Sequence, residues 1–363
     1  MIKSCIKGIK ISGISAAVPK EREILSEKFS ELFGEKAMAK FSQTAGVIER
    51  RIAKEEQTSS DLAFIAAVDL LEKKGVSADE IGAIIFVTQT PDYREPATAC
   101  VLHKRLNLPI DCIAFDVNLG CSGYVNGTQI AASLLQSINS KYALLLVGDT
   151  SNKVVSPEDK SQIMLFGDSG SATLLEKTEE DVCIDSAFRT DGKGFKAIII
   201  PAGAYRNRNA SRERVLWGDG NVRSDWDAYM NGMNVFAFAI SEVPKLINEF
   251  LASIGKDRED YDSCVFHQAN YYMIKQLVKR CKLPADRIPI SMDRYGNTSV
   301  TSIPLTICDA YGKSKDEGIK KLLLCGFGGG LSWGVVSLEI DTKDVFPVIE
   351  SDDYFEDGAV SHD

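Results

Sequence analysis

Cys121 is the residue of this 363-residue chain whose surroundings best suit nucleophilic chemistry. It lies in Leu-Gly-Cys-Ser-Gly (119–123), directly after an apolar run and before a stretch with helical spacing. A cysteine at the N-terminus of a helix meets free N–H groups and the positive end of the helix dipole, and both favour the nucleophilic thiolate. Free cysteines are also among the most buried residues in proteins, so a structural thiol remains the alternative.

Two polar residues further along the chain could assist a nucleophile. His267 follows the apolar run 264–266 in His-Gln-Ala-Asn, at the C-terminal end of a predicted strand, where α/β proteins place their chemistry. Asn297 lies in Tyr-Gly-Asn-Thr-Ser (295–299), a pattern that also suits a simple turn. Of the other two histidines, His103 fits a structural position in a helix and His362 lies near the C-terminus.

A glycine-rich segment, Gly-Phe-Gly-Gly-Gly-Leu (326–331), follows another apolar run. It does not match the dinucleotide-binding pattern, because Leu331 stands where the third glycine is required. The segment forms either a tight turn or a row of backbone N–H groups that face an oxyanion.

Alternating strand and helix patterns must position these residues. Such alternation is typical of α/β proteins, with strands buried on both faces. The predicted strands are 84–88, 112–117, 142–147, 198–202, 264–266 and 322–325, and the predicted helices are 60–74, 97–108, 122–138, 243–254 and 271–282.

The chain also repeats its own pattern at an offset of about 176 to 180 residues. We therefore expect two similar halves folded face to face, with residues near 121, 267 and 297 close together. The expected divisions are an N-terminal half with the cysteine (1–185), an insertion or loop region (186–230), a C-terminal half with the histidine and asparagine (231–340), and an acidic tail added to the core (341–363).

The composition excludes several classes of function. A net charge of −9 argues against nucleic-acid and anionic-membrane partners, and no apolar run approaches the ~20 residues of a membrane span. Nine scattered cysteines and a polar N-terminus without a secretory apolar segment predict free thiols in the cytoplasm. Without a Cys/His cluster we expect no metal site.

Four motifs in this order resemble the 3-oxoacyl-[acyl-carrier-protein] synthase III family of the thiolase superfamily. They are the cysteine at 121, His-Gln-Ala-Asn (267–270), Tyr-Gly-Asn-Thr-Ser (295–299) and Gly-Phe-Gly-Gly-Gly-Leu-Ser-Trp-Gly (326–334), and the resemblance extends from about residue 6 to residue 340. It implies a five-layered αβαβα fold built from two duplicated halves, and a homodimer that acts in fatty acid biosynthesis.

The resemblance also implies a reaction. The Cys121 thiolate would take an acyl group from acyl-CoA or an acyl carrier protein, in an oxyanion hole formed by the N–H groups of Cys121 and Gly329. Malonyl carrier protein would then lose CO₂, and His267 and Asn297 would stabilise the enolate that attacks the acyl-enzyme. The product is a 3-oxoacyl thioester, and no cofactor is implied beyond these thioester substrates.

Further residues are expected to bind the substrate or its carrier. On helix 271–282 the exposed spacing of Lys275, Lys279 and Lys282 predicts a docking face for an acidic carrier protein, although a solvated helix face is the alternative. Arg280 lies beside this face. By the resemblance, the remaining substrate-binding residues are Lys160, Gly232, Phe236 and Asn270.

Glu95 precedes Pro96 in a segment that, in the family, reaches the partner subunit's acyl pocket. One interpretation pairs it with Arg94 at the pocket entrance. The other gives it a polar acyl group to bind, or the role of a base, which would favour short or polar acyl chains.

The chain departs from the family where CoA would bind. The usual Trp and Arg are absent from 40–48, and Tyr272 replaces an arginine, so a carrier protein is the expected donor rather than CoA itself. Two other functions remain open: transfer of the acyl group to an amine or hydroxyl, as in secondary-metabolite or surface-sugar biosynthesis, and a non-catalytic scaffold that binds a carrier. His267 and Asn297 favour condensation, because simple transfer has less need of an enolate site.

Overall fold

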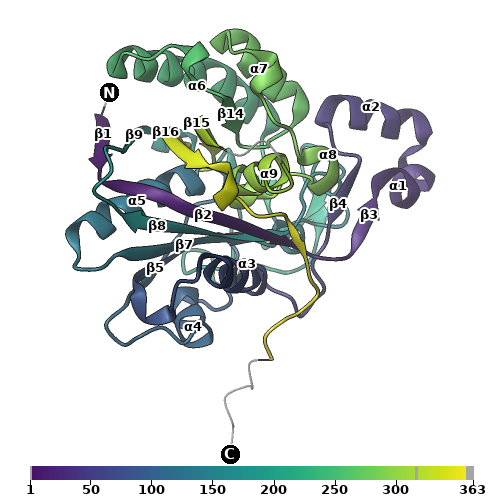
Figure 1. Ribbon diagram of the computed structural model, residues 1–363. Helices are drawn as coiled ribbons and strands as arrows, with labels where there is room; N and C mark the ends of the chain where they lie inside the picture. The colour runs from purple at the N-terminus through teal and green to yellow at the C-terminus, as the bar shows by residue number, and fades with distance from the viewer. Residues whose placement is uncertain (1, 315–317, 357–363) are drawn as a thin grey trace, which may run out of the picture.

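The computed structural model of this protein describes residues 2–314 and 318–356. Two main β-sheets extend through it (Figure 1). The lower, six-stranded sheet has the order β17 (Ile349–Glu350), β2 (Ile9–Val18), β8 (Ser169–Lys177), β7 (Tyr142–Asp149), β5 (Ile81–Val87), β6 (Ile113–Val117). The upper, five-stranded sheet has the order β1 (Ile2–Lys7), β9 (Cys183–Thr190), β16 (Ser332–Asp341), β15 (Ile319–Gly328), β14 (Ser263–Phe266).

Helices form three layers around these sheets. One pair covers the lower sheet from outside, another covers the upper sheet, and a third lies between the sheets and contacts strands of both (Figure 1). The pairs are, in that order, α3 (Ser59–Lys74) with α4 (Thr98–Arg105), α6 (Gly232–Ile254) with α7 (Tyr271–Cys281), and α5 (Gly123–Ser137) with α9 (Ser302–Tyr311). The predicted five-layered αβαβα fold is confirmed.

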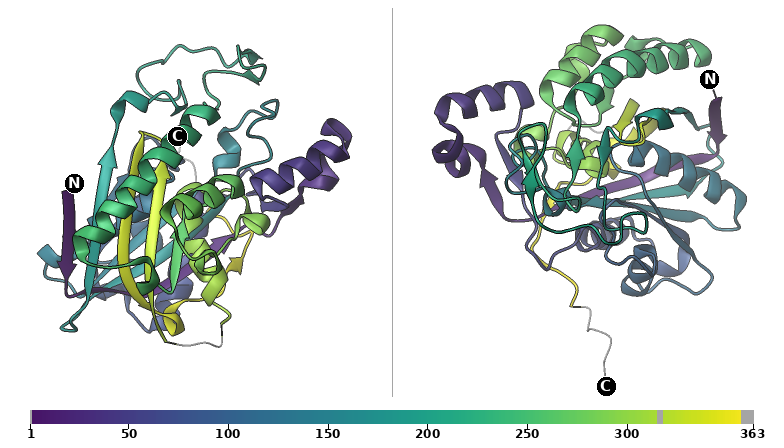
Figure 2. Two further views of the ribbon diagram at one scale, coloured as in Figure 1. Left: turned by 90° about the horizontal axis from the view of Figure 1, so that it is seen from above. Right: turned by 180° about the vertical axis from the view of Figure 1, so that it is seen from behind.

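Smaller elements surround this core. One helical hairpin with a two-stranded ribbon projects at the side of the molecule, at the right of Figure 1, and short ribbons follow β9 on the face that the right panel of Figure 2 shows. The elements are β3 (Arg22–Ile24), α1 (Leu25–Phe33), α2 (Glu35–Ala45), β4 (Glu49–Arg51), β10 (Ile198–Ile199), β11 (Val215–Leu216), β12 (Val222–Arg223), β13 (Tyr229–Met230), α8 (Met292–Tyr295) and the 3-10 helix η6 (Ser299–Thr301).

Local sequence explains the main elements. Strands β5 and β7 pair in parallel, and nearly all of their side chains are buried, as their unbroken apolar runs predict. Helix α3 begins at a capping box formed by Thr58 and Asp61, and it ends at Gly75 in the left-handed conformation. The core cluster that includes α5 and α9 draws on strands of both sheets and fixes their spacing.

The two sheets repeat one strand pattern, as the sequence suggests. In one sheet β2, β8, β7 and β5 are neighbours, and in the other β9, β16, β15 and β14 follow the same order with the same directions. Each end of the chain joins the sheet of the other half: the N-terminal strand β1 pairs with β9 in the upper sheet, and the C-terminal strand β17 pairs with β2 in the lower sheet. We propose that the halves 1–185 and 231–340 are the repeated units, with β1 and β17 crossing between them and with β9 of the upper sheet (Cys183–Thr190) extending across the boundary at residue 185.

Two predicted elements differ from the structure. The predicted buried strand 198–202 is reduced to β10, two partly exposed residues paired with β13, because its neighbours are loops rather than a sheet. The predicted helix 243–254 is the second part of α6, which begins at Gly232 and continues through Pro244. The sequence pattern missed the amphipathic first three turns.

The cysteines are not all free. Strands β1 and β9 are neighbours, and they bring Cys5 and Cys183 together in a disulfide across 178 residues of sequence. The expectation of nine free thiols is therefore wrong for this pair, which sequence spacing could not reveal. The other seven cysteines are free.

The segment after β16 belongs to the fold, contrary to the expectation of a tail added to the core. Val345 is part of the central core, and β17 extends the lower sheet. Three acidic residues of this segment form ion pairs with basic residues elsewhere in the fold: Asp344 with Lys74, Glu350 with Arg51 and Asp352 with Lys54. Residues 357–363 of the predicted tail lie outside the described residues.

Candidate active site

Cys121 lies in the turn between β6 and α5, next to the end of β15. Glycines of β15 make this close approach possible. A Cβ atom at Gly328 would lie 2.6 Å from the Cys121 Cβ and 3.1 Å from its Sγ, and one at Gly326 would lie 3.1 Å from the Cys121 carbonyl oxygen. Side chains at these positions would displace the cysteine. The glycine-rich segment therefore packs against the candidate nucleophile, and Gly328 is a residue that the sequence analysis did not single out.

His267 follows β14 and is buried. Its Nδ1 lies 2.7 Å from the Ser302 hydroxyl, and its ring meets Phe327 edge-on with the centroids 5.5 Å apart. Burial lowers the pKa of His267 to about 3, although the Ser299 backbone opposes this. The imidazole is therefore neutral at physiological pH, and its two contacts fix the plane of the ring.

Asn297 is held through both its backbone and its side chain. Its N–H donates to the Leu165 carbonyl at 2.9 Å, and its carbonyl accepts from the Gly167 N–H at 3.2 Å. The side-chain Oδ1 accepts from the Ser299 N–H at 2.9 Å. Because the oxygen is engaged there, the amide NH₂ faces the other way, where its contact to the Ala269 carbonyl is long, at 3.4 Å.

Ser299 connects the three predicted residues. Its hydroxyl lies 4.0 Å from the Cys121 Sγ, its N–H binds Asn297, and its carbonyl accepts from Ser302, which contacts His267. The structure therefore brings Cys121, His267 and Asn297 together around the turn 297–302. Sequence reasoning missed Ser299 and Ser302. The only indication of either residue in the sequence was that a serine, Ser299, follows Gly-Asn-Thr.

The surroundings of Cys121 do not by themselves produce a thiolate. Burial raises the pKa of its thiol to about 12, the negative charge of Asp149 adds to this rise, and hydrogen bonds from Ser299 and the local backbone oppose it. This differs from the expectation drawn from the helix N-terminus, because α5 begins inside the molecule rather than at its surface. The free thiol holds its proton at neutral pH.

Gly329, the predicted second oxyanion donor, follows the end of β15. The side chain of Ile198 in β10 is the nearest group to a Cβ built on it, at 3.7 Å. The first ribbon after β9 therefore lies against the glycine-rich segment. Its role as an oxyanion donor stays a prediction.

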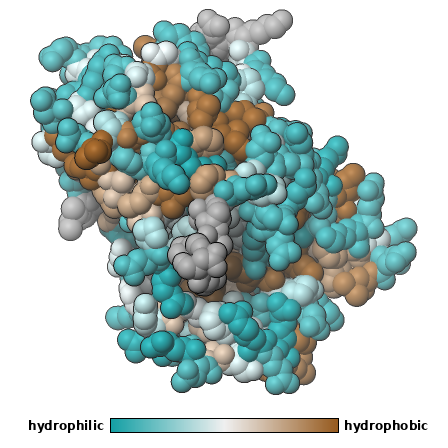
Figure 3. Space-filling view, turned by 90° about the horizontal axis from the view of Figure 1, so that it is seen from below, coloured by the Kyte–Doolittle hydropathy of each residue, from teal (hydrophilic) through white to brown (hydrophobic). Residues whose placement is uncertain are grey.

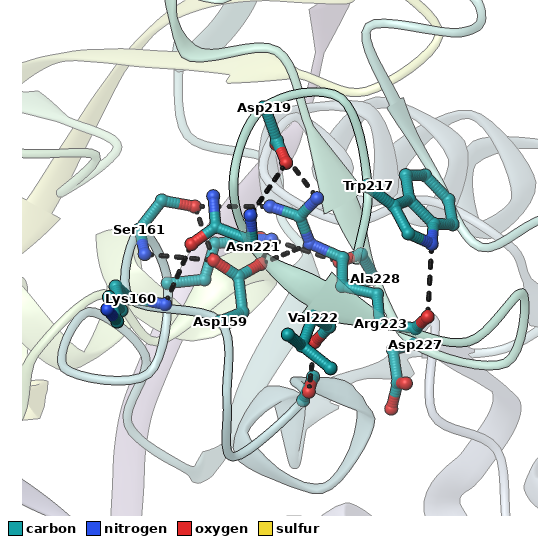
Figure 4. Close-up of polar contacts among 12 residues, drawn as sticks. Asp159, Lys160, Ser161, Trp217, Asp219, Asn221, Val222, Arg223, Asp227 and Ala228 are labelled. Atoms are coloured by element: carbon teal, nitrogen blue, oxygen red, sulfur yellow. Dashed lines mark hydrogen bonds and ion pairs between the residues drawn. The ribbon is translucent and has the colours of Figure 1, made fainter. Parts of the chain in front are cut away.

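A buried arginine anchors the loop region 186–230 to the rest of the molecule (Figure 4). Arg223 of β12 has no exposed surface, and its guanidinium donates to Asp159 at 2.5 Å and to Asp219 at 2.8 Å. Buried ion pairs need such additional hydrogen bonds to offset desolvation. Nothing in the sequence distinguished Arg223 from the other arginines of this region.

Lys160 lies beside this clamp. Its N–H donates to the Asn221 side chain at 3.0 Å, and its own side chain is exposed (Figure 4). The clamp therefore sets the position of the backbone that carries Lys160. The substrate-binding role predicted for Lys160 stays a prediction.

The other predicted binding residues lie at the start of α6 and α7. Gly232 is the first residue of α6, and Phe236 stacks on Tyr272 with the ring centroids 5.6 Å apart. Asn270 caps α7, its Oδ1 accepting from the Met273 N–H at 2.8 Å. The amide oxygen of Asn270 therefore has a structural partner already.

Helix α7 presents the predicted basic face. Lys275, Lys279 and Arg280 are exposed, whereas the apolar residues on the other side are largely buried. The two lysines border a surface groove of about 570 Å³ between α7 and the segment that follows it. Cys121, His267 and Asn297 do not line this groove, so it is separate from the catalytic cluster.

Glu95 is exposed, and the described residues contain no ion pair between it and Arg94. Arg94 instead donates to the Gly203 carbonyl and lies over the Tyr205 ring, 5.0 Å from its centroid. The interpretation that pairs the two residues is therefore not supported. Glu95 remains available to another group.

Comparisons with known proteins show the family to which the chain belongs. A model of 3-oxoacyl-[acyl-carrier-protein] synthase III matches residues 115–192, and a model of the C-terminal part of that family matches residues 251–340. The chain is 34% identical to the β-ketoacyl-[acyl-carrier-protein] synthase III of Xanthomonas axonopodis pv. citri over 325 residues, which cover 90% of this chain and 96% of the relative. The chain belongs to the 3-oxoacyl-[acyl-carrier-protein] synthase III family.

Two further relatives support the same family assignment. A putative 3-oxoacyl-[acyl-carrier-protein] synthase 3 of Campylobacter jejuni is 35% identical over 345 residues, covering 93% of this chain and 95% of that protein. The solved 3-oxoacyl-(acyl-carrier protein) synthase of Burkholderia xenovorans LB400 superposes with a TM-score of 0.90 at 37% identity, over 96% of this chain and 99% of that one. The protein is accordingly a condensing enzyme of the synthase III type, an acyltransferase of the thiolase superfamily.

Proposed function

We propose that Cys121, His267 and Asn297 carry out a decarboxylative condensation in two half-reactions. In the first, the Cys121 sulfur attacks an acyl thioester, and the N–H groups of Cys121 and Gly329 stabilise the oxyanion. In the second, a malonyl thioester loses CO₂, and its enolate carbon attacks the acyl-enzyme to form a 3-oxoacyl thioester. The observation that carries this proposal is the turn 297–302, whose Ser299 contacts or connects all three residues.

The enolate needs hydrogen-bond donors that remain neutral. The Asn297 amide NH₂ is such a donor, and its orientation is fixed by the Ser299 N–H on its oxygen. The Ser302 hydroxyl has one proton and lies near both the Ser299 carbonyl and the His267 Nδ1. In the structure Ser302 gives this proton to the Ser299 carbonyl, so donation to the enolate requires Ser302 to turn its proton to the His267 Nδ1. The imidazole then carries its own proton on Nε2 and can donate it to the enolate.

An acyl carrier protein is the proposed donor and acceptor of thioesters. The exposed lysines of α7 give this acidic enzyme a local basic face, which would attract an acidic partner. Small acyl thioesters, acyl-CoA among them, are the alternative donors. Lys160, Gly232, Phe236, Asn270 and Glu95 are proposed to contact the substrate or its carrier arm.

We further propose a homodimer through the edge of the lower sheet. Strand β6 is the last strand of that sheet, and no other strand of residues 2–314 and 318–356 pairs with its outer edge. Its first residue, Ile113, and the nearby Ile110 are exposed, and apolar patches interrupt the hydrophilic surface on the face seen from below (Figure 3). An unpaired edge beside exposed apolar side chains is suited to a second copy of this chain.

The cytoplasm remains the proposed compartment, because the proposed substrates are intracellular thioesters. Among the described residues, every helix is too short or too polar to cross a bilayer.

Gel filtration with light scattering would test the proposed homodimer. A monomer would contradict it.

The decisive experiment measures the two half-reactions separately. Purified protein is incubated with an acyl thioester, and mass spectrometry of the peptide containing Cys121 detects the acyl group. Malonyl carrier protein is then added, and CO₂ release is recorded. We expect acylation in the wild type, none in Cys121→Ser, and CO₂ release only with malonyl carrier. Acylation without decarboxylation would instead indicate transfer to an amine or hydroxyl, and absence of acylation would indicate a scaffold.

A further inference from the structure

Asp149 is a buried carboxylate close to Cys121 that the proposed mechanism leaves unused. It is the last residue of β7 and has no exposed surface. Its Oδ1 accepts hydrogen bonds from the Gln89 N–H at 2.7 Å, the Thr88 hydroxyl at 3.1 Å and the Thr90 hydroxyl at 3.3 Å. Its Oδ2 has no hydrogen-bond partner among the described residues. Buried oxygens without a hydrogen-bond partner are rare, and a catalytic role is one of the explanations for them.

The groups that form hydrogen bonds with Asp149 are uncharged. Thr88, Gln89 and Thr90 face it from the segment after β5, and Ser169 lies opposite it on β8. The 3-10 helix η6 packs against β7. Burial raises the pKa of Asp149, and the hydroxyl of Ser299 and the N–H of Val300, both in η6, are among the groups that oppose this rise. The titratable neighbour whose pKa Asp149 shifts is Cys121.

Ser299 holds its hydroxyl close to both this carboxylate and the thiol, because η6 packs against β7 next to Cys121. Its hydroxyl is 4.0 Å from the Cys121 Sγ and 3.2 Å from the position that a Cβ at Gly120 would occupy. Its φ is 50°, in the left-handed region that side-chain-bearing residues rarely adopt. Strained residues of this kind occur at functional sites, where the surrounding structure maintains them. A glycine would adopt this φ more easily, but the serine supplies a hydroxyl near the Asp149 carboxylate and the Cys121 thiol.

We propose that Asp149 accepts the proton of the Cys121 thiol, with the Ser299 hydroxyl as the bridge. This inference rests on the proposed function, because a thiolate is needed only if Cys121 takes up an acyl group. The S–H bond breaks and its proton passes to the Ser299 oxygen, while the proton of that hydroxyl passes to the Asp149 carboxylate. The products are a thiolate, an intact serine hydroxyl and a neutral carboxylic acid.

This step keeps the charge of the buried site constant. Before it, the single negative charge is on Asp149, and after it the same charge is on Cys121. Release of the proton to solvent would instead create a second buried anion beside the first, which is unfavourable. Once the acyl group is transferred, the proton on Asp149 is available for the departing thiolate of the donor.

The opposite role, a carboxylate that only repels the thiolate, predicts an opposite result. If Asp149 acted solely through its charge, Asp149→Asn would lower the thiol pKa and speed reactions of Cys121. If Asp149 accepts the proton, the same variant slows them. The reaction measured is alkylation of Cys121 by iodoacetamide between pH 6 and 9, followed by mass spectrometry, together with the rate of acylation in a single turnover.

We expect Asp149→Asn to reduce both rates at neutral pH by about 10²-fold, a usual contribution of proton transfer. Ser299→Gly should reduce them as well, because it removes the bridging hydroxyl at a φ that glycine adopts readily. The matched control is Ser171→Ala on the neighbouring strand β8, which removes a buried serine hydroxyl that has no hydrogen-bond partner among the described residues. This control should react like the wild type.

Unchanged or faster alkylation in Asp149→Asn would overturn the proposal. If Asp149→Asn does not fold, as judged by cooperative thermal unfolding, Ser299→Gly decides, and alkylation at the wild-type rate in that variant also overturns it. CO₂ release from malonyl carrier protein is measured in parallel. Decarboxylation does not use the thiolate. An absence of CO₂ release in the wild-type enzyme would therefore contradict the proposed function rather than this inference.

Discussion

Replacement of Asn297 by alanine should separate the two half-reactions. The backbone of Asn297 is bonded to Leu165 and Gly167 on both sides, so truncation of the side chain leaves the turn in place. What is lost is the amide NH₂ proposed to donate to the enolate. Acylation of Cys121 does not use this donor. We therefore expect normal acyl-enzyme formation and a strong loss of CO₂ release.

The size of the loss follows from the number of donors. One preorganised donor to an oxyanion contributes about 2.7–4 kcal/mol, or a factor of about 10² to 10³ in rate. The proposed enolate site has two donors, so Asn297→Ala retains His267 and decarboxylation should fall by about 10² to 10³. The Ser299 N–H also loses its acceptor, and a buried N–H without a partner reduces the free energy of unfolding by about 1–3 kcal/mol.

Asn297→Asp is the matched control for that second effect. Its carboxyl can still accept from the Ser299 N–H, so the stability change should be smaller. It offers no NH₂ and adds negative charge where the enolate forms, so decarboxylation should fall at least as far as in Asn297→Ala. The assay measures CO₂ from carboxyl-labelled malonyl carrier protein and, separately, acylation by mass spectrometry. CO₂ release by Asn297→Ala within a few-fold of the wild-type rate would refute the assignment, and so would an equally large loss of acylation.

Three further results are expected. Glu95→Phe should shift the preferred acyl thioesters toward longer alkyl chains, because it replaces an exposed carboxylate, which forms no ion pair in the part of the chain that the structure describes, with an apolar ring. Identical acyl profiles would show that Glu95 does not define the pocket. Charge reversal at Lys275 and Lys279 should raise the KM for carrier-bound substrate and leave that for a small thioester unchanged, whereas equal effects would argue against docking. Burial lowers the pKa of His267 to about 3, so the unfolded chain binds a proton below pH 6.5 that the folded one does not. Between pH 7 and pH 5, the free energy of unfolding measured in urea should therefore fall by about 2 kcal/mol more in the wild type than in His267→Asn. Equal decreases in the two proteins would contradict a buried neutral imidazole.

The sequence predicted the layers better than it predicted their edges. Unbroken apolar runs such as those of β5 and β7 identify strands buried on both faces, and the internal repeat predicts that two such sheets face each other. The pairing of β1 with β9, and with it the Cys5–Cys183 disulfide, depends on a contact across 178 residues that no local pattern carries. The same holds for β17, because its two residues become a strand only where the edge of β2 is available.

The candidate site was predicted to a similar degree. Cys121 and His267 follow strand ends, Asn297 follows the short helix α8, and the internal repeat brings the equivalent loops of the two halves together, so the proximity of the three residues was predictable. The residues that connect them were not, because the contacts of Ser299 and Ser302 depend on a positive φ and on the exact path of the turn. Arg223 and Asp159 were missed for another reason. A buried ion pair consists of residue types that are common in exposed loops, and only the fold shows that Arg223 has no solvent-accessible surface.

The shared turn 297–302 has a consequence for catalysis. It supplies an enolate donor from Asn297, orients His267 through Ser302, and places the Ser299 hydroxyl beside the thiol. A displacement of this turn would therefore move the donors of the second half-reaction and the bridge of the first together. Because condensation requires the enolate carbon to reach the acyl-enzyme, groups fixed to one rigid turn keep the two reacting centres in register. Substitutions that loosen the turn should impair condensation more than the product of their effects on the separate half-reactions.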